Sequence, residues 1–181
     1  MELSIGQKVA YPGQGVCVVE QIEKRSIGGS VVRCYLLRVL GDGSHILIPA
    51  ANSDSVGLRS VISINQCKKL IKRLSADFEE VSPDWKTRSR QFMEKLQSGD
   101  VFEAADVLKK LTFLSHGKKL SFREQTLLEK AKFLIMSEII NADFATEETI
   151  APRLGELVES ACTKHLKTQP MYATATAAGV S

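Results

Sequence analysis

The sequence predicts an α+β protein in which a small antiparallel β barrel precedes an all-α half. Short segments rich in Val and Ile, separated by Gly turns, fill the first 60 residues. From residue 61 onward apolar residues recur at helical spacing, and several helix-start signals follow. We expect a barrel domain over residues 1–60, a connecting helix and linker over 61–81, a helical domain over 82–167 and a flexible tail over 168–181.

The predicted strands are bounded by turn residues. Pro12-Gly13, Gly28-Gly29 and the Gly-Asp-Gly run at residues 41–43 are turn signals, and the second of them joins two strands into a hairpin. The strands are expected at residues 8–11, 15–25, 31–40, 44–48 and near 56–59. Five such strands cannot bury two faces as an open sheet, so we expect an SH3-like or Tudor-like barrel without exposed edges.

The connecting helix is predicted by a change of period. Ile64, Cys67, Ile71 and Leu74 share one helical face, and residues 75–81 break the pattern as a linker.

The helical domain then has its own start signals. Ser82 is expected as an N-cap, with Pro83 in the first helical position and Asp84 in the first turn. Further starts are expected at Asp100 with Glu103, at Ser121 with Glu124, and at Thr146. Pro152 lies close to the last of these starts, so that helix is expected to begin later or to bend.

Charge and composition exclude several classes of protein. The net charge is +3, made of +5 over residues 1–74 and −2 over residues 75–181, so any nucleic-acid surface in the second half must be local. No apolar run is long enough to suggest a membrane span, and the start does not look like a secretion signal, so a cytoplasmic location is expected. We expect no cofactor and no membrane association.

The residues that could carry catalysis or bind metal are scattered. Cys17, Cys34, Cys67 and Cys162 form no CxxC pair, and they are expected to be buried free thiols without a metal site. Known nucleotide-binding, hydrolase and metalloprotease motifs are absent from the sequence. We expect no enzymatic activity; an enzyme with a low-pKa cysteine is a remote rival, because Cys17 and Cys34 have no basic or His neighbour in sequence.

The most informative segment surrounds the single tryptophan. Trp85 stands at a predicted helix start with Lys86, Arg88 and Arg90 beside it. One interpretation is that Trp85 caps the helical core and that the basic residues are merely solvated. The other is an aromatic wedge flanked by phosphate contacts, as in proteins that hold distorted DNA.

A second basic cluster, which is either a solvated turn or a further DNA contact, is also predicted. It comprises Lys109, Lys110, Lys118, Lys119 and Arg123.

The chain resembles the bacterial CarD/CdnL transcription regulators, whose barrel is shared with transcription-repair coupling factors. The opening IGQKVAYPGQGV at residues 5–16 suggests the barrel, and the helical half with its tryptophan separates the chain from the much longer coupling factors. The resemblance covers about residues 1–165 and is carried by residues 5–16, 35–37, 48–52, 56–59, 84–85, 94–100 and 120–124.

The resemblance implies a bridge between RNA polymerase and promoter DNA. The barrel would bind the β subunit of RNA polymerase, with Arg25 and Ile27 on the polymerase-facing strand. Leu47 stands where relatives often have a basic residue, so an apolar polymerase contact is implied there. Trp85 would wedge into the minor groove at the upstream edge of the melted region, with Lys86, Arg88 and Arg90 on the DNA backbone, without sequence specificity.

We therefore expect a non-enzymatic regulator of transcription initiation that stabilises the promoter open complex and acts as a monomer. The alternative is a protein–protein adaptor with a Tudor-like barrel that binds no DNA.

Overall fold

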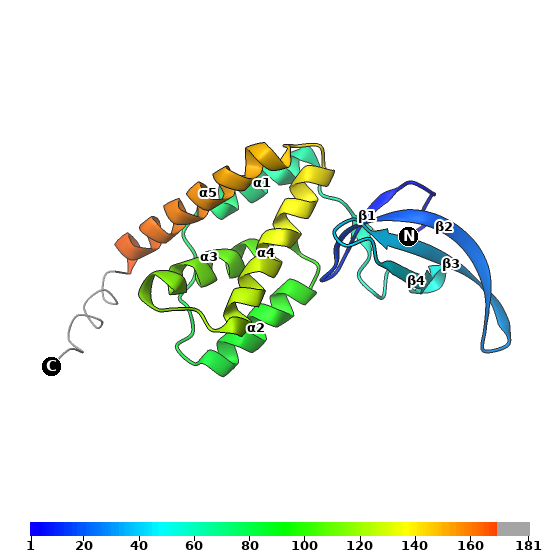
Figure 1. Ribbon diagram of the computed structural model, residues 1–181, viewed down its shortest axis with the longest axis horizontal. Helices are drawn as coiled ribbons and strands as arrows, with labels where there is room; N and C mark the ends of the chain where they lie inside the picture. Colours follow the sequence, from blue (N-terminus) through cyan, green and yellow to red (C-terminus); the bar gives the residue numbers. More distant parts are fainter. Residues whose placement is uncertain (170–181) are drawn as a thin grey trace.

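The computed structural model describes residues 1–169 and shows two halves joined side by side, a β-sheet half and a helical half (Figure 1). The predicted α+β class is confirmed. The predicted flexible tail at 168–181 lies almost entirely outside the described residues. The strands are β1 (Lys8–Tyr11), β2 (Gly15–Ile27), β3 (Ser30–Val39), β4 (His45–Pro49) and β5 (Arg59–Ser60), with a 3₁₀ turn η1 (Ala50–Asn52) after β4.

The five strands form one antiparallel sheet in the order β4-β3-β2-β1-β5. β2 and β3 make a long hairpin with a register shift between Val19 and Gln21, which is the signature of a β-bulge. The hairpin curves away from the rest of the sheet in Figure 1. Within residues 1–169, β4 and β5 do not pair, so the sheet curls but keeps two edges. The expected removal of all edges is therefore wrong, because β5 is only two residues long and pairs with β1 alone.

The core of the sheet half lies on one face of the curled sheet. Val19, Leu37 and Ile48 are buried there, and Leu3 covers them from the N-terminal segment. The hydroxyl of Tyr35 accepts a hydrogen bond from the backbone N–H of Leu3 at 3.2 Å, so the segment before β1 is held against the core.

The helical half contains a larger core to which every helix contributes. The helices are α1 (Ile64–Leu74), α2 (Trp85–Gln97), α3 (Val101–Gly117), α4 (Phe122–Asn141) and α5 (Glu147–Thr168). Two predicted details differ. Asp84, not Ser82, is the N-cap of α2, so Pro83 lies outside the helix. Pro152 neither delays nor ends α5, which runs continuously through it from the predicted cap Thr146. Across residues 1–169, no helix has the length and apolar character that crossing a membrane requires.

Candidate nucleic-acid interface

Trp85 is the first residue of α2 and projects into solvent. The Asp84 carboxylate caps the helix by accepting the backbone N–H of Thr87 at 2.9 Å. The Trp85 side chain shares the helical face of Phe92 and Leu96, but in the first turn it is not part of the core that buries those two residues, and it remains 60% exposed. This exposure disfavours the interpretation of Trp85 as a cap on the helical core, because most of the ring lies outside the packed helices.

A second aromatic residue, Phe122, is presented in the same manner. Phe122 is the first residue of α4 and is 86% exposed. It follows a capping box in which Ser121 and Glu124 each accept the other's backbone N–H. The cap at Ser121 was predicted from the sequence, but the exposed Phe122 ring was not. The available signal was an aromatic residue at the first helical position, outside the inward face of that helix.

An ion pair joins the two helix starts. The Arg88 guanidinium donates to the Glu124 carboxylate at 2.8 Å and to the carbonyl of Ser82 at 2.9 Å. Its contact with the Pro83 carbonyl is longer, at 3.3 Å. Because this ion pair connects the first turn of α2 to that of α4, Trp85 and Phe122 lie at the same end of the helical half.

Arg88 is therefore misplaced among the predicted phosphate contacts. The residue is only 4% exposed, and its donors are committed to one carboxylate and two backbone carbonyls. A guanidinium so enclosed cannot reach a phosphate without breaking the packing around α2. Its role in this structure is to hold the segment that presents Trp85.

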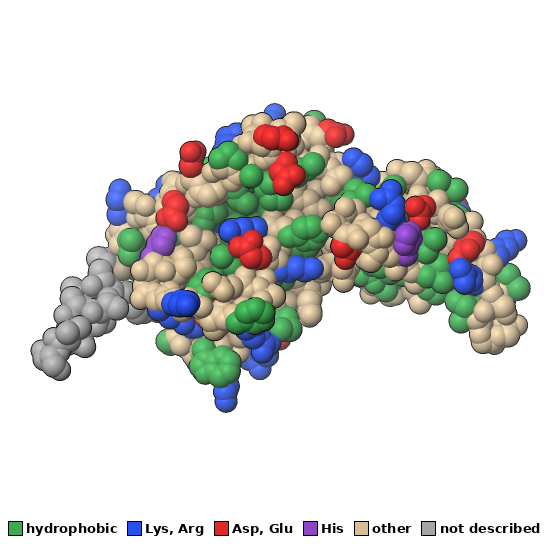
Figure 2. Space-filling view, viewed as in Figure 1, with side chains coloured by type: hydrophobic (Ala, Val, Ile, Leu, Met, Phe, Trp, Pro, Cys, Tyr) green, Lys and Arg blue, Asp and Glu red, His purple; other side chains and the backbone are tan. Residues whose placement is uncertain are grey.

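The cations beside the two rings are exposed. The Lys86 ammonium lies 5.8 Å from the centroid of the Trp85 ring, and Arg90 makes only a 3.9 Å contact with Glu94 at the surface. Hydrophobic and basic side chains gather at the lower end of the helical half, over the start of α2 (Figure 2). We call these residues the aromatic-basic patch; they are Trp85, Lys86, Arg90, Lys119, Phe122 and Arg123.

The second basic cluster divides in two. Lys119 and Arg123 are exposed and belong to the patch, whereas Lys118 is exposed but lies 3.5 Å from Glu124. Lys109 and Lys110 are buried, and the Lys109 ammonium donates to the Arg73 carbonyl at 2.7 Å. Lys109 therefore stabilises the junction of α1 and the linker instead of facing solvent.

The contacts at the starts of α2 and α4 change the pKa of the Glu124 carboxyl. Burial alone would raise the pKa of its carboxyl. The hydrogen bonds from Ser121 and Arg88, with the charge of Lys118, outweigh burial and lower the pKa from 4.5 to about 2. Glu124 is consequently charged at neutral and at mildly acidic pH.

We predict that this carboxylate makes folding pH-dependent. A lowered folded-state pKa contributes stability that is complete above the unfolded value of 4.5 and is lost as pH falls toward 2. Urea unfolding of the wild type and Glu124→Gln should differ by about 2 kcal/mol near neutral pH, after a discount for solvent screening. That difference should shrink below pH 4.5. A difference that stays constant down to pH 2 would contradict the assignment.

The predicted polymerase-binding residues share one face of the sheet. Arg25 pairs with Val32 and Ile27 pairs with Ser30, while Leu47 pairs with Leu36 on the other side of β3. Directly opposed residues point to the same face, so the alternation along β3 puts all three side chains on the face away from the core. All three are exposed, and among the described residues the outer edge of β4 pairs with no strand.

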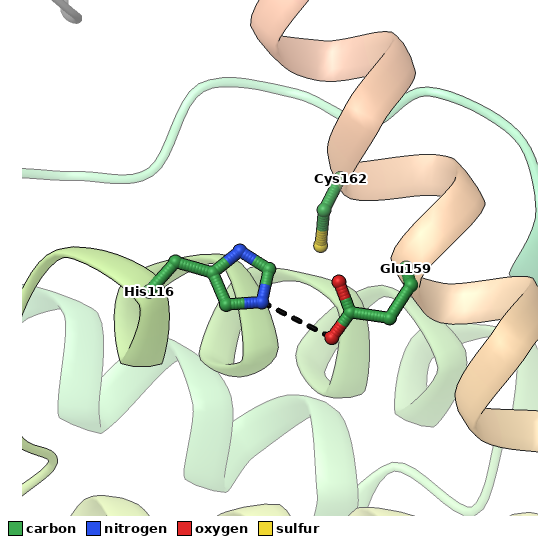
Figure 3. A group of neighbouring side chains, drawn as sticks. All are labelled: His116, Glu159 and Cys162. Carbon is green, nitrogen blue, oxygen red and sulfur yellow. Dashed lines mark hydrogen bonds and ion pairs between the residues drawn. The ribbon is translucent and has the colours of Figure 1, made fainter.

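One group of possible metal ligands converges between α3 and α5 (Figure 3). His116 Nε2 lies 3.1 Å from a Glu159 carboxylate oxygen, and the Cys162 thiol lies beside both. Burial, followed by the charge of Glu159, raises the pKa of Cys162 to about 12. The thiol is thus protonated beside a hydrogen-bonded His116–Glu159 pair and is poorly suited to bind metal. His165, which follows Cys162 closely in the sequence, instead forms a hydrogen bond with the Asp77 carboxylate at 2.8 Å.

The cysteines give no support to the rival thiol enzyme. All four are buried and unpaired, as predicted. Burial raises the pKa of Cys17 to about 11, with a smaller contribution from Asp42. A reactive cysteine needs the opposite shift, because the thiolate is the nucleophile.

A curled sheet is followed by a helical half with an exposed tryptophan beside cations, and the family models that match the two halves make the chain a two-part regulator of transcription. Residues 3–62 match the family model of the CarD-like/TRCF RID domain, and residues 69–154 match that of the CarD C-terminal domain. The chain belongs to the CarD/CdnL family. The predicted resemblance is confirmed, since the two models match in order along one chain.

Two of the proteins that are similar to this chain are a curated relative and a solved structure. The "Putative transcription factor YdeB" of Bacillus subtilis (strain 168) is 25% identical over 146 residues, which is 81% of this chain and 95% of that protein. The solution structure of the 72-residue N-terminal domain of Myxococcus xanthus CarD is 30% identical, covering 33% of this chain and 79% of that one. Its TM-score is 0.29, so it carries no argument about the fold.

Proposed function

We propose that this regulator binds the β subunit of RNA polymerase through its sheet half and stabilises the promoter open complex through Trp85. The observation that carries the proposal is the ring itself, 60% exposed at the start of α2 and held there by buried contacts behind it. Flanking Lys86 and Arg90 would bind backbone phosphates at the upstream edge of the melted DNA. The proposal needs no catalysis and implies a cytoplasmic location.

The energetic demand on one side chain is modest. Contact between an aromatic ring and a base is worth about 1–3 kcal/mol. A stabilisation of that size shifts an equilibrium between open and closed promoter about 5- to 150-fold. The exposed Phe122 ring at the same end of the helical half adds apolar surface for the displaced bases.

Attachment to polymerase keeps the protein close to promoter DNA, which its small net charge alone would not do. A net charge of +3 gives weak attraction to free DNA, but a tethered patch works at high effective concentration. On the sheet half, the outer face with Arg25, Ile27 and Leu47, together with the unpaired edge of β4, offers apolar contact and main-chain hydrogen bonds to a partner. One copy of the chain contains both surfaces, so a monomer suffices.

Footprinting of polymerase–promoter complexes with a single-strand-specific reagent tests the proposal. Saturating protein should increase the reactivity of bases at the upstream edge of the bubble, because reclosure is hindered there. Unchanged reactivity at saturation, with the protein demonstrably bound to polymerase, would refute the wedge and favour the adaptor.

A further inference from the structure

We propose that Glu138 is a positioning residue for Trp85, acting through α4 as a rigid strut between the sheet half and the aromatic-basic patch. This inference rests on the proposed function. It identifies α4 as the helix that sets the distance and orientation between the polymerase-binding sheet half and Trp85. α4 carries two buried carboxylates, Glu124 near its start and Glu138 near its end. Glu124 binds Arg88 behind Trp85, whereas Glu138 binds the sheet half.

Glu138 contacts two segments directly and is linked to a third through Arg59. It is only 3% exposed, and its carboxylate pairs with the Arg59 guanidinium of β5. It also accepts the backbone N–H of Ile62 at 3.0 Å, at the point where the chain enters the helical half. Arg59 in turn donates to the carbonyl of Gly99, between α2 and α3, at 2.6 and 3.0 Å. We call Arg59, Ile62, Gly99 and Glu138 the interdomain clamp.

The hydrogen bonds of the interdomain clamp form only in a narrow range of orientations of the groups that they join. The planar Arg59 guanidinium, bound to the Glu138 carboxylate and to the carbonyls of Gly99 and Ser60, accepts few relative orientations of its partners. Burial of such an ion pair contributes little net stability, because desolvation offsets the attraction between the charges. Its contribution is a defined arrangement of β5, α4 and the α2–α3 connection.

Close packing beside the clamp restricts the same arrangement. The Phe133 ring of α4 lies over the glycines that flank β2 and β3: a Cβ placed on Gly41 would be 2.5 Å from that ring, and one placed on Gly15 would be 3.0 Å from it. One turn further along α4, the Ser137 hydroxyl accepts the backbone N–H of Val16 at 3.0 Å. These contacts leave no room for the sheet half to slide along α4.

The strut links these contacts to Trp85. Glu124 and Glu138 are separated by about 21 Å along α4 at 1.5 Å per residue. Over that length a tilt of about ten degrees would displace the far end by roughly 4 Å, more than the thickness of a stacked base. Loss of the clamp is therefore expected to misplace Trp85 relative to polymerase while leaving the tryptophan and its cations unchanged.

The direct test measures the distance between the halves. Spin labels on Ser30→Cys, at the start of β3, and Gln91→Cys on α2 should give a narrow distance distribution, and the native thiols are buried. Glu138→Gln should broaden the distribution by weakening the Arg59 pair, and Gly41→Ala should shift it by steric contact with Phe133. Gly41 has no positive φ, so its alanine variant tests packing without backbone strain.

Asp106→Asn is the matched control. Asp106 is also a buried carboxylate with two basic partners, Arg73 and Lys109, but it joins elements within the helical half. It should lower the unfolding temperature at least as much as Glu138→Gln and leave the distance distribution narrow.

A second experiment measures the lifetime of the promoter open complex with each variant. Glu138→Gln and Gly41→Ala should shorten it at least 3-fold with unchanged affinity for polymerase, whereas Asp106→Asn should not. A narrow, unshifted distribution in both test variants, or an equal lifetime loss in Asp106→Asn, overturns the positioning role. A normal lifetime with Trp85→Ala instead overturns the proposed function, and the distance measurement separates these two failures.

Discussion

Replacing Trp85 with alanine should shorten the lifetime of the promoter open complex by about 5- to 150-fold, the equivalent of the 1–3 kcal/mol of a lost aromatic–base contact. Affinity for polymerase should not change, because the sheet half is untouched. Folding should not change either, since a side chain that is 60% exposed contributes within about 0.5 kcal/mol to stability. Dissociation of open complexes after addition of a competitor measures the effect.

Ile64→Ala is the matched control for Trp85→Ala. Ile64 is another exposed apolar residue at the start of a helix, but it belongs to α1 and lies outside the aromatic-basic patch. Equal lifetimes for wild type, Trp85→Ala and Ile64→Ala would leave the wedge without support. A partial loss shared by Trp85→Ala and Phe122→Ala would extend the contact over both rings.

Replacing Arg88 with alanine should cost about 3–5 kcal/mol of folding free energy, because Glu124 and two carbonyls would lose a buried partner. For a chain of this size, the unfolding temperature should fall on the order of 10 °C. Arg88→Lys should lie between the wild type and alanine, since one ammonium cannot reach all three acceptors. Thermal unfolding followed by circular dichroism provides the measurement.

Arg90→Ala, two residues away, provides the contrast. Arg90 is exposed and touches only Glu94, so its removal should leave the unfolding temperature almost unchanged. It should instead weaken DNA binding by the polymerase complex and reduce the salt dependence by about one phosphate contact. The opposite pattern, a stable Arg88→Ala protein with weakened DNA binding, would restore Arg88 as a phosphate contact.

Most of the secondary structure could be predicted because its signals are local. Helices α3 and α4 begin at the predicted positions, after Asp100 and Ser121, and the capping box at Ser121 involves residues three apart. The start of α2 was misplaced because Ser82, Pro83 and Asp84 are all good start residues, and local rules do not choose among them. The bond from Asp84 to Thr87 decides the choice in the folded chain.

The candidate site was predictable only in part. Trp85 and Lys86 could be selected because an isolated aromatic next to cations is visible in one segment. Phe122 was missed because its partners in the patch come from another helix. Arg88 was wrongly assigned to DNA, because a basic side chain is expected to be exposed when its hydrogen-bond acceptor is not known. The acceptor, Glu124, is 36 residues away in the chain.

By itself the sequence determined the α+β class, the order of the two halves, the caps of α3 and α4 and the family, since periodicity, turn chemistry and motifs depend on residues close together in the chain. Tertiary structure alone decided which charges are buried, which aromatic rings remain outside, and how the halves are joined. The physical reason is that burial of a charge depends on partners brought together by folding, such as Arg59 and Glu138, 79 residues apart.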